Sequence, residues 1–183
     1  MATLTAAADS HTQGGMIALI PSAEDAARLA VAGGEAPEEL HLTLLFLGDD
    51  GGAWTEAERD DLEQTIRLTV EDRGVGPVHA KAFGAAHWNA GGDSPCWVWS
   101  IGDAEPGGIG RSETLQQVRG LVIEALTQSR TPDVPPQHTP WAAHVTAAYS
   151  GDPALLPELE QRLGPITFDR IRLAFGEPST LVP

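Results

Sequence analysis

Hydrophobic positions along the chain fall into short blocks separated by polar, glycine and proline residues. Six blocks have the length and composition of β-strands, at residues 15–21, 40–47, 78–83, 96–101, 142–149 and 166–175. Four segments with apolar residues every three to four positions predict helices, at residues 22–32, 55–72, 112–129 and 152–163. Strands and helices alternate throughout, which predicts a mixed α and β fold, and the last strand is expected to bulge near Asp169.

The chain length bounds the number of domains. With 183 residues, the chain is long enough for one domain with a substantial core. We expect this domain to span residues 15–183, after a flexible arm of residues 1–14 that is rich in Ala, Thr, Ser and Gly. No apolar run approaches the roughly 18 residues of a transmembrane helix, and the arm lacks the features of a secretory signal. We therefore expect a cytoplasmic protein without membrane contact.

The charge balance limits the partners. The chain has 11 Lys and Arg against 26 Asp and Glu, for a net charge of −15. Duplex nucleic acids are bound mainly through cationic side chains on their phosphates, so we expect no long duplex partner. A small anionic ligand is still compatible, because one site can be neutral or positive within an acidic surface. Cys96 has no second cysteine to pair with and is expected to be a small buried residue beside Trp97.

Two predicted strands carry the same short pattern of histidine, apolar residue, threonine, apolar residue. The first contains His41 and Thr43, and the second contains His144 and Thr146. Alternate residues of a strand point to the same face, so each histidine shares a face with its threonine while the apolar residues point into a core. Helices follow both segments at similar distances, which indicates an internal duplication with the two pairs on facing strands.

Two facing imidazoles suit general acid–base chemistry. The ordinary pKa of histidine is near 6.5, so one ring can be neutral and its partner protonated near neutral pH. One ring can take a proton from a nucleophile while the other gives a proton to the leaving oxygen. Two threonine hydroxyls can donate hydrogen bonds to the non-bridging oxygens of a phosphate between them. This set suits a phosphodiester better than a carbonyl, because it contains no obvious nucleophile.

The pattern also has a purely structural interpretation. One such segment is usually a strand whose His and Thr side chains satisfy local hydrogen bonds. Two copies in one small chain, each in a predicted strand, are much less frequent by chance. The residues alone leave catalysis and a structural role equally open.

Longer stretches around both patterns resemble a known family. Residues 37–48, PEELHLTLLFLG, strongly resemble the first signature of the two-histidine (2H) phosphoesterases. The resemblance is strongest to the branch of bacterial 2'-5' RNA ligases and RNA 2',3'-cyclic phosphodiesterases. Residues 141–149, WAAHVTAAY, resemble the second signature, and residues 166–176 are similar to the closing strand of the family.

The resemblance implies a fold and an activity. The fold would be α+β and bilobal, with two antiparallel β-sheet lobes related by a pseudo-two-fold axis, helices outside and a central cleft. The activity would be hydrolysis, or its reversal, at 2',3'-cyclic or 2'-5' phosphodiesters. Acid–base chemistry by two histidines needs no metal or cofactor, and we expect a monomer because a bilobal cleft already supplies both half-sites. His41, Thr43, His144 and Thr146 would form the catalytic set, with His144 favoured as the base and His41 as the acid. The alternative is a nucleotide-binding module that keeps the fold without turnover.

The chain departs from the family pattern at two positions. Ala143 stands where proline commonly precedes the second histidine, and Tyr149 stands where RNA-processing members often carry arginine. Together with the acidic charge, the second change favours a nucleotide, a dinucleotide or a cyclic oligonucleotide over long RNA. Tyr149 either contacts the substrate or fills space in the sheet, and Trp141 is expected to bind substrate at the rim of the cleft.

Several other residues have side chains that could take part in chemistry or packing. Phe46 is expected in the core, because strand parity places it on the side of the apolar residues of its strand. Trp88, Trp97 and Trp99 are expected mainly to pack the lobes. No further residues stand at the spacing of a metal site or a phosphate loop, so the remaining histidines are expected to be structural or on the surface; they are His11, His79, His87 and His138.

Overall fold

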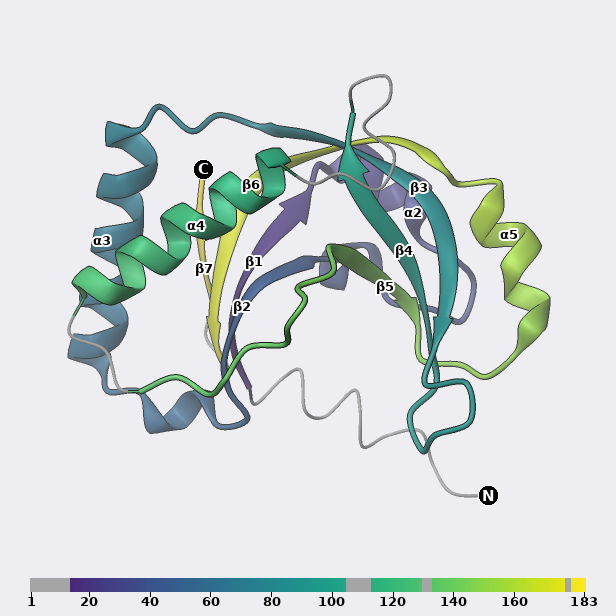
Figure 1. The fold of residues 1–183 in the computed structure, drawn as a ribbon, viewed down its shortest axis with the longest axis horizontal. Coiled ribbons are helices and arrows are strands. Elements are labelled where there is room, and N and C mark those ends of the chain that lie inside the picture. Colours follow the sequence, from purple (N-terminus) through teal and green to yellow (C-terminus); the bar gives the residue numbers. More distant parts are fainter. Residues whose placement is uncertain (1–13, 105–112, 130–132, 177–178) are drawn as a thin grey trace.

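The computed structural model describes residues 14–104, 113–129, 133–176 and 179–183. Seven strands form the sheet (Figure 1): β1 (Gly15–Pro21), β2 (Leu42–Gly48), β3 (Val78–Trp88), β4 (Cys96–Asp103), β5 (His144–Ala148), β6 (Gly164–Phe175) and β7 (Ser179–Val182). The α-helices are α2 (Ala23–Leu29), α3 (Glu56–Asp72), α4 (Glu113–Gln128) and α5 (Leu156–Glu160). Three short 3-10 turns complete the described elements: η1 (Pro37–Glu39), η2 (Gly51–Ala53) and η3 (Pro153–Leu155).

Most elements lie where the hydrophobic pattern predicts them. Thr55 caps α3 in a complete capping box with Glu58, as the sequence predicts. The register of β1 against β6 skips Asp169, which confirms the bulge expected there. The helix predicted at residues 152–163 is instead divided into η3 and α5, and β3 extends five residues beyond the predicted strand. The hydrophobic pattern does not predict strand β7.

All strand pairs are antiparallel, in the order β2-β1-β6-β3-β4-β5, with β7 on β6. The α+β class and the antiparallel pairing are therefore confirmed. Strands β3 and β6 pair only between Val78–Ala82 and Gly164–Phe168, and each then continues with a different partner. Strand β6 runs on beside β1, and β3 runs on beside β4. The two expected β-sheet lobes are thus joined into one continuous sheet through this short pair.

The order of elements repeats along the chain. The first half runs β1, α2, β2, α3, β3, and the second half runs β4, α4, β5, α5, β6. Within the halves, β1 pairs with β2 and β4 pairs with β5, while β3 and β6 connect to the opposite half. This repeat agrees with the expected duplication, and a geometric two-fold relation between the halves stays a prediction.

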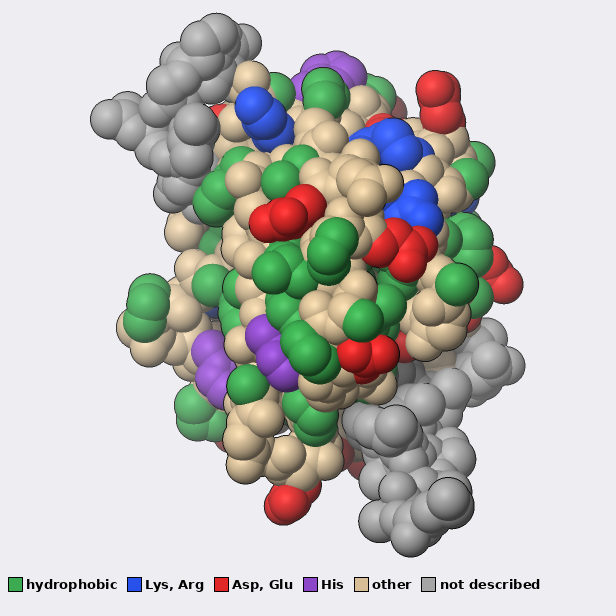
Figure 2. Space-filling view, turned by 90° about the vertical axis from the view of Figure 1, so that its right-hand side faces the viewer, with side chains coloured by type: hydrophobic (Ala, Val, Ile, Leu, Met, Phe, Trp, Pro, Cys, Tyr) green, Lys and Arg blue, Asp and Glu red, His purple; other side chains and the backbone are tan. Residues whose placement is uncertain are grey.

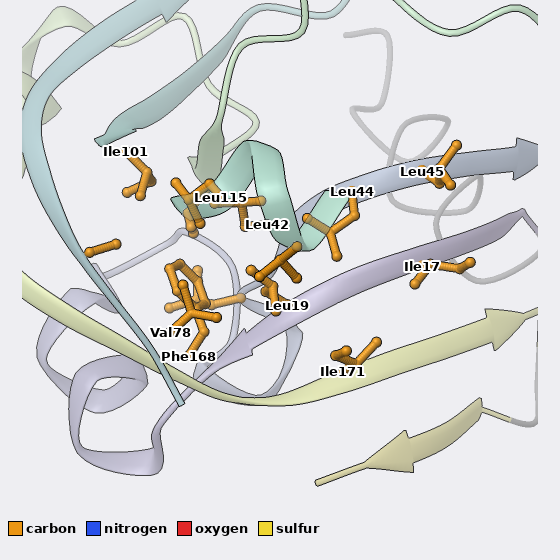
Figure 3. Packing of buried hydrophobic residues seen from close by; sticks show 14 of the residues in the cluster. Ile17, Leu19, Leu42, Leu44, Leu45, Val78, Ile101, Leu115, Phe168 and Ile171 are labelled. Carbon is orange, nitrogen blue, oxygen red and sulfur yellow. The ribbon is translucent and has the colours of Figure 1, made fainter. Parts of the chain in front are cut away.

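The helices cover one face of each half of the sheet. Helices α3 and α4 pack against each other and over β6 (Figure 1). Ile171 of β6 lies beside residues of both helices. Helix α5 lies beside β3, and its Leu159 carbonyl accepts a hydrogen bond from Nε1 of the fully buried Trp99 at 3.3 Å. One large hydrophobic cluster fills the space between helices and strands (Figure 3). In the described part of the chain, no helix is long and apolar enough to cross a membrane.

Candidate active site

A pocket of about 220 Å³ lies between β2, the end of β3 and the start of β5. It is lined by Thr43, Leu44, Phe46, Trp88, Gln137, His138, Pro140, Trp141, Ala142 and His144. Thr43 belongs to the first His-x-Thr pattern and His144 to the second, so the fold brings the two patterns to one pocket. His41 and Thr146 do not line this pocket.

The sheet register places both patterns on the face that the helices leave uncovered. Thr43 pairs with Ala18, which in turn pairs with Arg172, so these three side chains share one face. Arg172 lies between Ile171 and Leu173, and Ile171 faces α3 and α4. The Thr43 face is therefore the opposite one.

The second pattern has the same placement. His144 pairs with Ser100 and Thr146 pairs with Val98, the residues that flank Trp99 in β4. Trp99 points toward α5, so His144 and Thr146 point to the other face. The alternation of apolar and polar residues in each strand is what separates a buried face from the face that carries the histidines.

Both histidine rings make the same kind of hydrogen bond to the backbone. Nδ1 of His41 lies 2.6 Å from the carbonyl oxygen of Glu39, and Nδ1 of His144 lies 2.8 Å from that of Ala142. A carbonyl oxygen only accepts hydrogen bonds, so Nδ1 is the protonated nitrogen and donates in both rings. In the neutral form, Nε2 then carries the lone pair. Each ring can take up or release a proton at Nε2 while Nδ1 keeps its orientation.

The surroundings of His144 favour its neutral form. The ring is half-buried, and the centroid of the Trp88 ring lies 4.3 Å from its own at an interplanar angle of 49°. Burial lowers the pKa of His144, positive charge on His138 lowers it further, and the bond to Ala142 opposes the change. An imidazole that is neutral at pH 7 is suited to act as a general base.

This environment gives a direct expectation for titration. The pKa of His144, followed by NMR across a pH series, should lie below the 6.5 of an ordinary imidazole. His138→Gln removes a nearby positive charge and should raise that pKa, while His79→Gln, whose ring contacts Thr167 elsewhere in the sheet, should leave it unchanged. A His144 that titrates above 6.5, or equal shifts in both variants, would contradict this description of the site.

Side chains hold the outer edge of β2 against the segment that leads to His144. The Trp141 Nε1 donates to the Thr43 carbonyl at 3.1 Å, and the Arg119 guanidinium lies 5.2 Å from the Trp141 ring centroid. The Gln137 amide accepts from the Phe46 N–H at 3.0 Å and donates to the Phe46 carbonyl at 2.9 Å. Trp141, expected at the cleft rim, thus lines the pocket. Its indole N–H connects the segment before His144 to the strand that carries Thr43.

Tyr149 lies just after β5 and does not line the pocket. Its half-buried side chain makes a hydrogen bond with Thr146, and burial together with the charge of Glu35 raises its pKa above the ordinary range. Glu35 is brought close because its N–H donates to the Ala147 carbonyl at 2.8 Å. The neighbouring Gly34 packs so tightly that a Cβ there would lie 2.3 Å from the same oxygen. Tyr149 is therefore a neutral phenol bonded to one of the threonines proposed for catalysis.

Phe46 corrects an expectation from the sequence. Parity with Leu42 predicts it in the core, but it is 37% exposed and lines the pocket. The register of β1 against β2 steps from Ile17–Leu45 to Ala18–Thr43, so Leu44 is an extra residue in a bulge. The bulge reverses the parity and turns Phe46 to the Thr43 face. No feature of the hydrophobic pattern marks this bulge.

The remaining candidates are placed as follows. Cys96 is buried, and Trp97 and Trp99 are in the core, as expected. The ring of His87 stacks on Trp97 at 4.4 Å and 5°, and His79 contacts the Thr167 hydroxyl at 3.2 Å, so both have structural partners. Within the described residues, no three His, Cys, Asp or Glu side chains are grouped to hold a metal ion. His11 lies outside the described residues.

Comparisons with known proteins show the fold. No family model and no curated protein matches the chain. TT0787 of Thermus thermophilus has a similar solved structure, with a TM-score of 0.57 and 19% identity over 93% of this chain and 95% of that one. E. coli LigT in its apo form gives a TM-score of 0.52 at 16% identity, and LigT complexed with 3'-AMP gives 0.55 at 15%. Both LigT comparisons cover 93% of this chain and 94% of LigT. The chain therefore shares the fold of these proteins.

Proposed function

We propose that this chain is a phosphodiesterase that acts on 2',3'-cyclic phosphates or 2'-5'-linked nucleotides through His41 and His144. The observation that carries the proposal is the matched hydrogen bonding of the two rings, each from Nδ1 to the carbonyl two residues before it. Both rings belong to His-x-Thr patterns that meet at one pocket through Thr43 and His144. The resemblance of both patterns to the 2H phosphoesterase signatures, and the fold shared with E. coli LigT, support the same conclusion.

On a cyclic phosphate, the two rings divide the proton transfers. Neutral His144 takes a proton from water at Nε2, and the water oxygen forms a new bond to phosphorus. The bond from phosphorus to one ribose oxygen breaks, and His41 donates the proton on its Nε2 to that oxygen. The product is a nucleoside 2'- or 3'-monophosphate in which the ribose oxygen that left phosphorus is a free hydroxyl. His144 ends protonated and His41 neutral, so exchange with solvent resets the site, and the reverse reaction exchanges the two roles.

The threonines stabilise the charge that develops on the phosphate. The hydroxyls of Thr43 and Thr146 can each donate to a non-bridging oxygen, and these bonds strengthen as the phosphorus becomes five-coordinate. Tyr149 contributes by its hydrogen bond with Thr146, which restricts the rotation of that hydroxyl. We therefore assign Tyr149 a positioning role that acts on Thr146.

The pocket beside His144 favours a nucleoside as the attached group. Phe46 and Trp88 provide aromatic walls, and a flat base can stack on such rings. Solved structures of E. coli LigT hold 3'-AMP, ATP and NADP+, which are small nucleotides. On the side of the molecule that carries α5, basic side chains are few and lie beside acidic ones (Figure 2). The chain as a whole has 11 Lys and Arg against 26 Asp and Glu, and this balance favours a short substrate over a long RNA.

A nucleotide-binding module without turnover is the second candidate. Tyr149 stands where RNA-processing members of the resembled family often carry arginine, so one cationic contact to a phosphate is missing at that position. The pocket with its aromatic walls would still hold a nucleotide. The two candidates differ in whether a bond is broken.

Product analysis on a small substrate panel separates them. The panel contains 2',3'-cyclic mononucleotides, a 2'-5' dinucleotide, its 3'-5' isomer and mixed-linkage cyclic dinucleotides, each incubated with and without EDTA and analysed by chromatography. We expect turnover of a cyclic phosphate or a 2'-5' bond, unchanged by EDTA, with the 3'-5' dinucleotide as the uncleaved control. Binding without product would support the module, and activity abolished by EDTA would contradict the metal-independent mechanism.

A further inference from the structure

Arg172 lies on the same face of the sheet as Thr43 but outside both His-x-Thr patterns. It occupies β6 near the end of the chain and shares a row with Ala18 and Thr43 across three strands. Its side chain is only 15% exposed. Its Nε is buried without a hydrogen-bond partner, so the charge is stabilised through Nη1 and Nη2, because burying an unpaired charge is costly.

The partners of Arg172 are in the turn that precedes His41. Its Nη2 donates to the Glu38 carbonyl at 2.7 Å, and its Nη1 lies 3.6 Å from the Glu39 carboxylate. The Glu39 carbonyl in turn accepts the hydrogen bond from His41 Nδ1 at 2.6 Å. Arg172 therefore holds the peptide unit next to the one that orients the catalytic ring.

The turn needs such an anchor. It is the 3-10 turn η1, which has only three residues, all exposed, and no side-chain cap at its start. A hydrogen bond from a charged guanidinium is stronger than one between neutral groups, and more so when it is largely shielded from water. Arg172 is thus well suited to fix a turn that has few contacts of its own.

His144 is anchored differently. Its acceptor, the Ala142 carbonyl, lies between Trp141, whose Nε1 is bonded to Thr43, and Ala143, whose carbonyl accepts from the Ile101 N–H at 2.9 Å. A change at Arg172 should therefore reach His41 without disturbing the anchor of His144.

We infer that Arg172 is a positioning residue that keeps His41 in its productive tautomer and orientation by clamping η1. The effect on catalysis rests on the proposed function, while the effect on the ring does not. Both can be measured with Arg172→Met, which keeps an unbranched stem and removes every donor. The matched control is Arg170→Met, on the same strand and face, because Arg170 bonds instead to Asp169 and the Pro21 carbonyl.

The first readout is the nitrogen NMR spectrum of the ring in uniformly ¹⁵N-labelled protein. Wild type should show His41 protonated mainly at Nδ1 in its neutral form. Arg172→Met should shift His41 toward the tautomer protonated at Nε2 and leave His144 unchanged, and Arg170→Met should alter neither ring. An unchanged His41 signal in Arg172→Met, or equal changes in both variants, overturns the inference.

The second readout is steady-state kinetics on the best substrate of the panel. Arg172→Met should lower kcat by up to about 10²-fold, since a misplaced catalytic group costs on this order, with little change in KM. Arg172→Lys, which keeps one cationic donor, should lose less, and it decides the question if Arg172→Met does not fold. Suppose that Arg172→Met does not fold and that Arg172→Lys has the tautomer ratio and kcat of wild type. Arg172 would then have a purely structural role. If wild type turns over no substrate, the proposed function fails and the tautomer measurement still tests the clamp.

Discussion

Replacing His144 by alanine is expected to lower kcat by about 10²–10⁴-fold, the range that a positioned general acid or base contributes. His41→Ala should cause a loss of the same order, because each ring carries one of the two proton transfers. The rates are measured by chromatography on the preferred substrate of the panel, with folding checked by circular dichroism.

The control for both variants is His79→Ala, which removes an imidazole of the same sheet that contacts Thr167 instead of the pocket. It should keep the activity of wild type. The double variant should be little slower than either single variant, because the acid and the base act in the same step and their losses do not add. Losses that multiply fully would show that the two rings act independently, against the mechanism proposed for His41 and His144.

Removing either of the threonine hydroxyls proposed to stabilise the phosphate is expected to have the second largest effect. Thr43→Val and Thr146→Val preserve the side-chain shape and delete one donor each. Removal of one preorganised donor to a developing oxyanion costs on the order of 10²–10³-fold in kcat, and we expect the lower end here because the threonines are only half-buried. KM should change little, since the donors act mainly on the transition state.

Thr180→Val on β7 is the matched control, because it deletes a half-buried hydroxyl of the same sheet away from the pocket. The measurement is kcat and KM of the three variants on one substrate. If Thr43→Val or Thr146→Val raises KM with kcat unchanged, the hydroxyl binds the ground state only. That result would contradict the role given to the threonines.

The sequence predicts well the faces that carry the two His-x-Thr patterns, because those faces need only local alternation. Any β-strand directs the side chains of neighbouring residues such as Val145 and Thr146 to opposite faces. The register of β4 with β5 confirms that Thr146 lies away from the core. The capping box at Thr55 is equally local, because donor and acceptor lie three residues apart.

Other features depend on contacts that sequence spacing does not carry. The bulge at Leu44 reverses the strand parity and turns Phe46 into the pocket, although the apolar pattern runs on without a break. Arg172 contacts η1 although it is 134 residues away from Glu38 in the sequence, so no motif around His41 predicts this contact. Long-range pairing, such as the short β3–β6 ladder that joins the two halves, is likewise set by the packing of whole elements.

The proposed mechanism requires two imidazoles and no metal ion to hydrolyse a phosphodiester. The most direct test incubates a 2',3'-cyclic mononucleotide with wild type and with the double variant His41→Ala/His144→Ala, both in EDTA, and follows the products by chromatography. We predict that wild type forms a nucleoside monophosphate and that the folded double variant forms it more slowly by at least about 10²-fold. Equal product from both proteins would show that the paired His-x-Thr patterns are structural and would contradict the two-histidine mechanism.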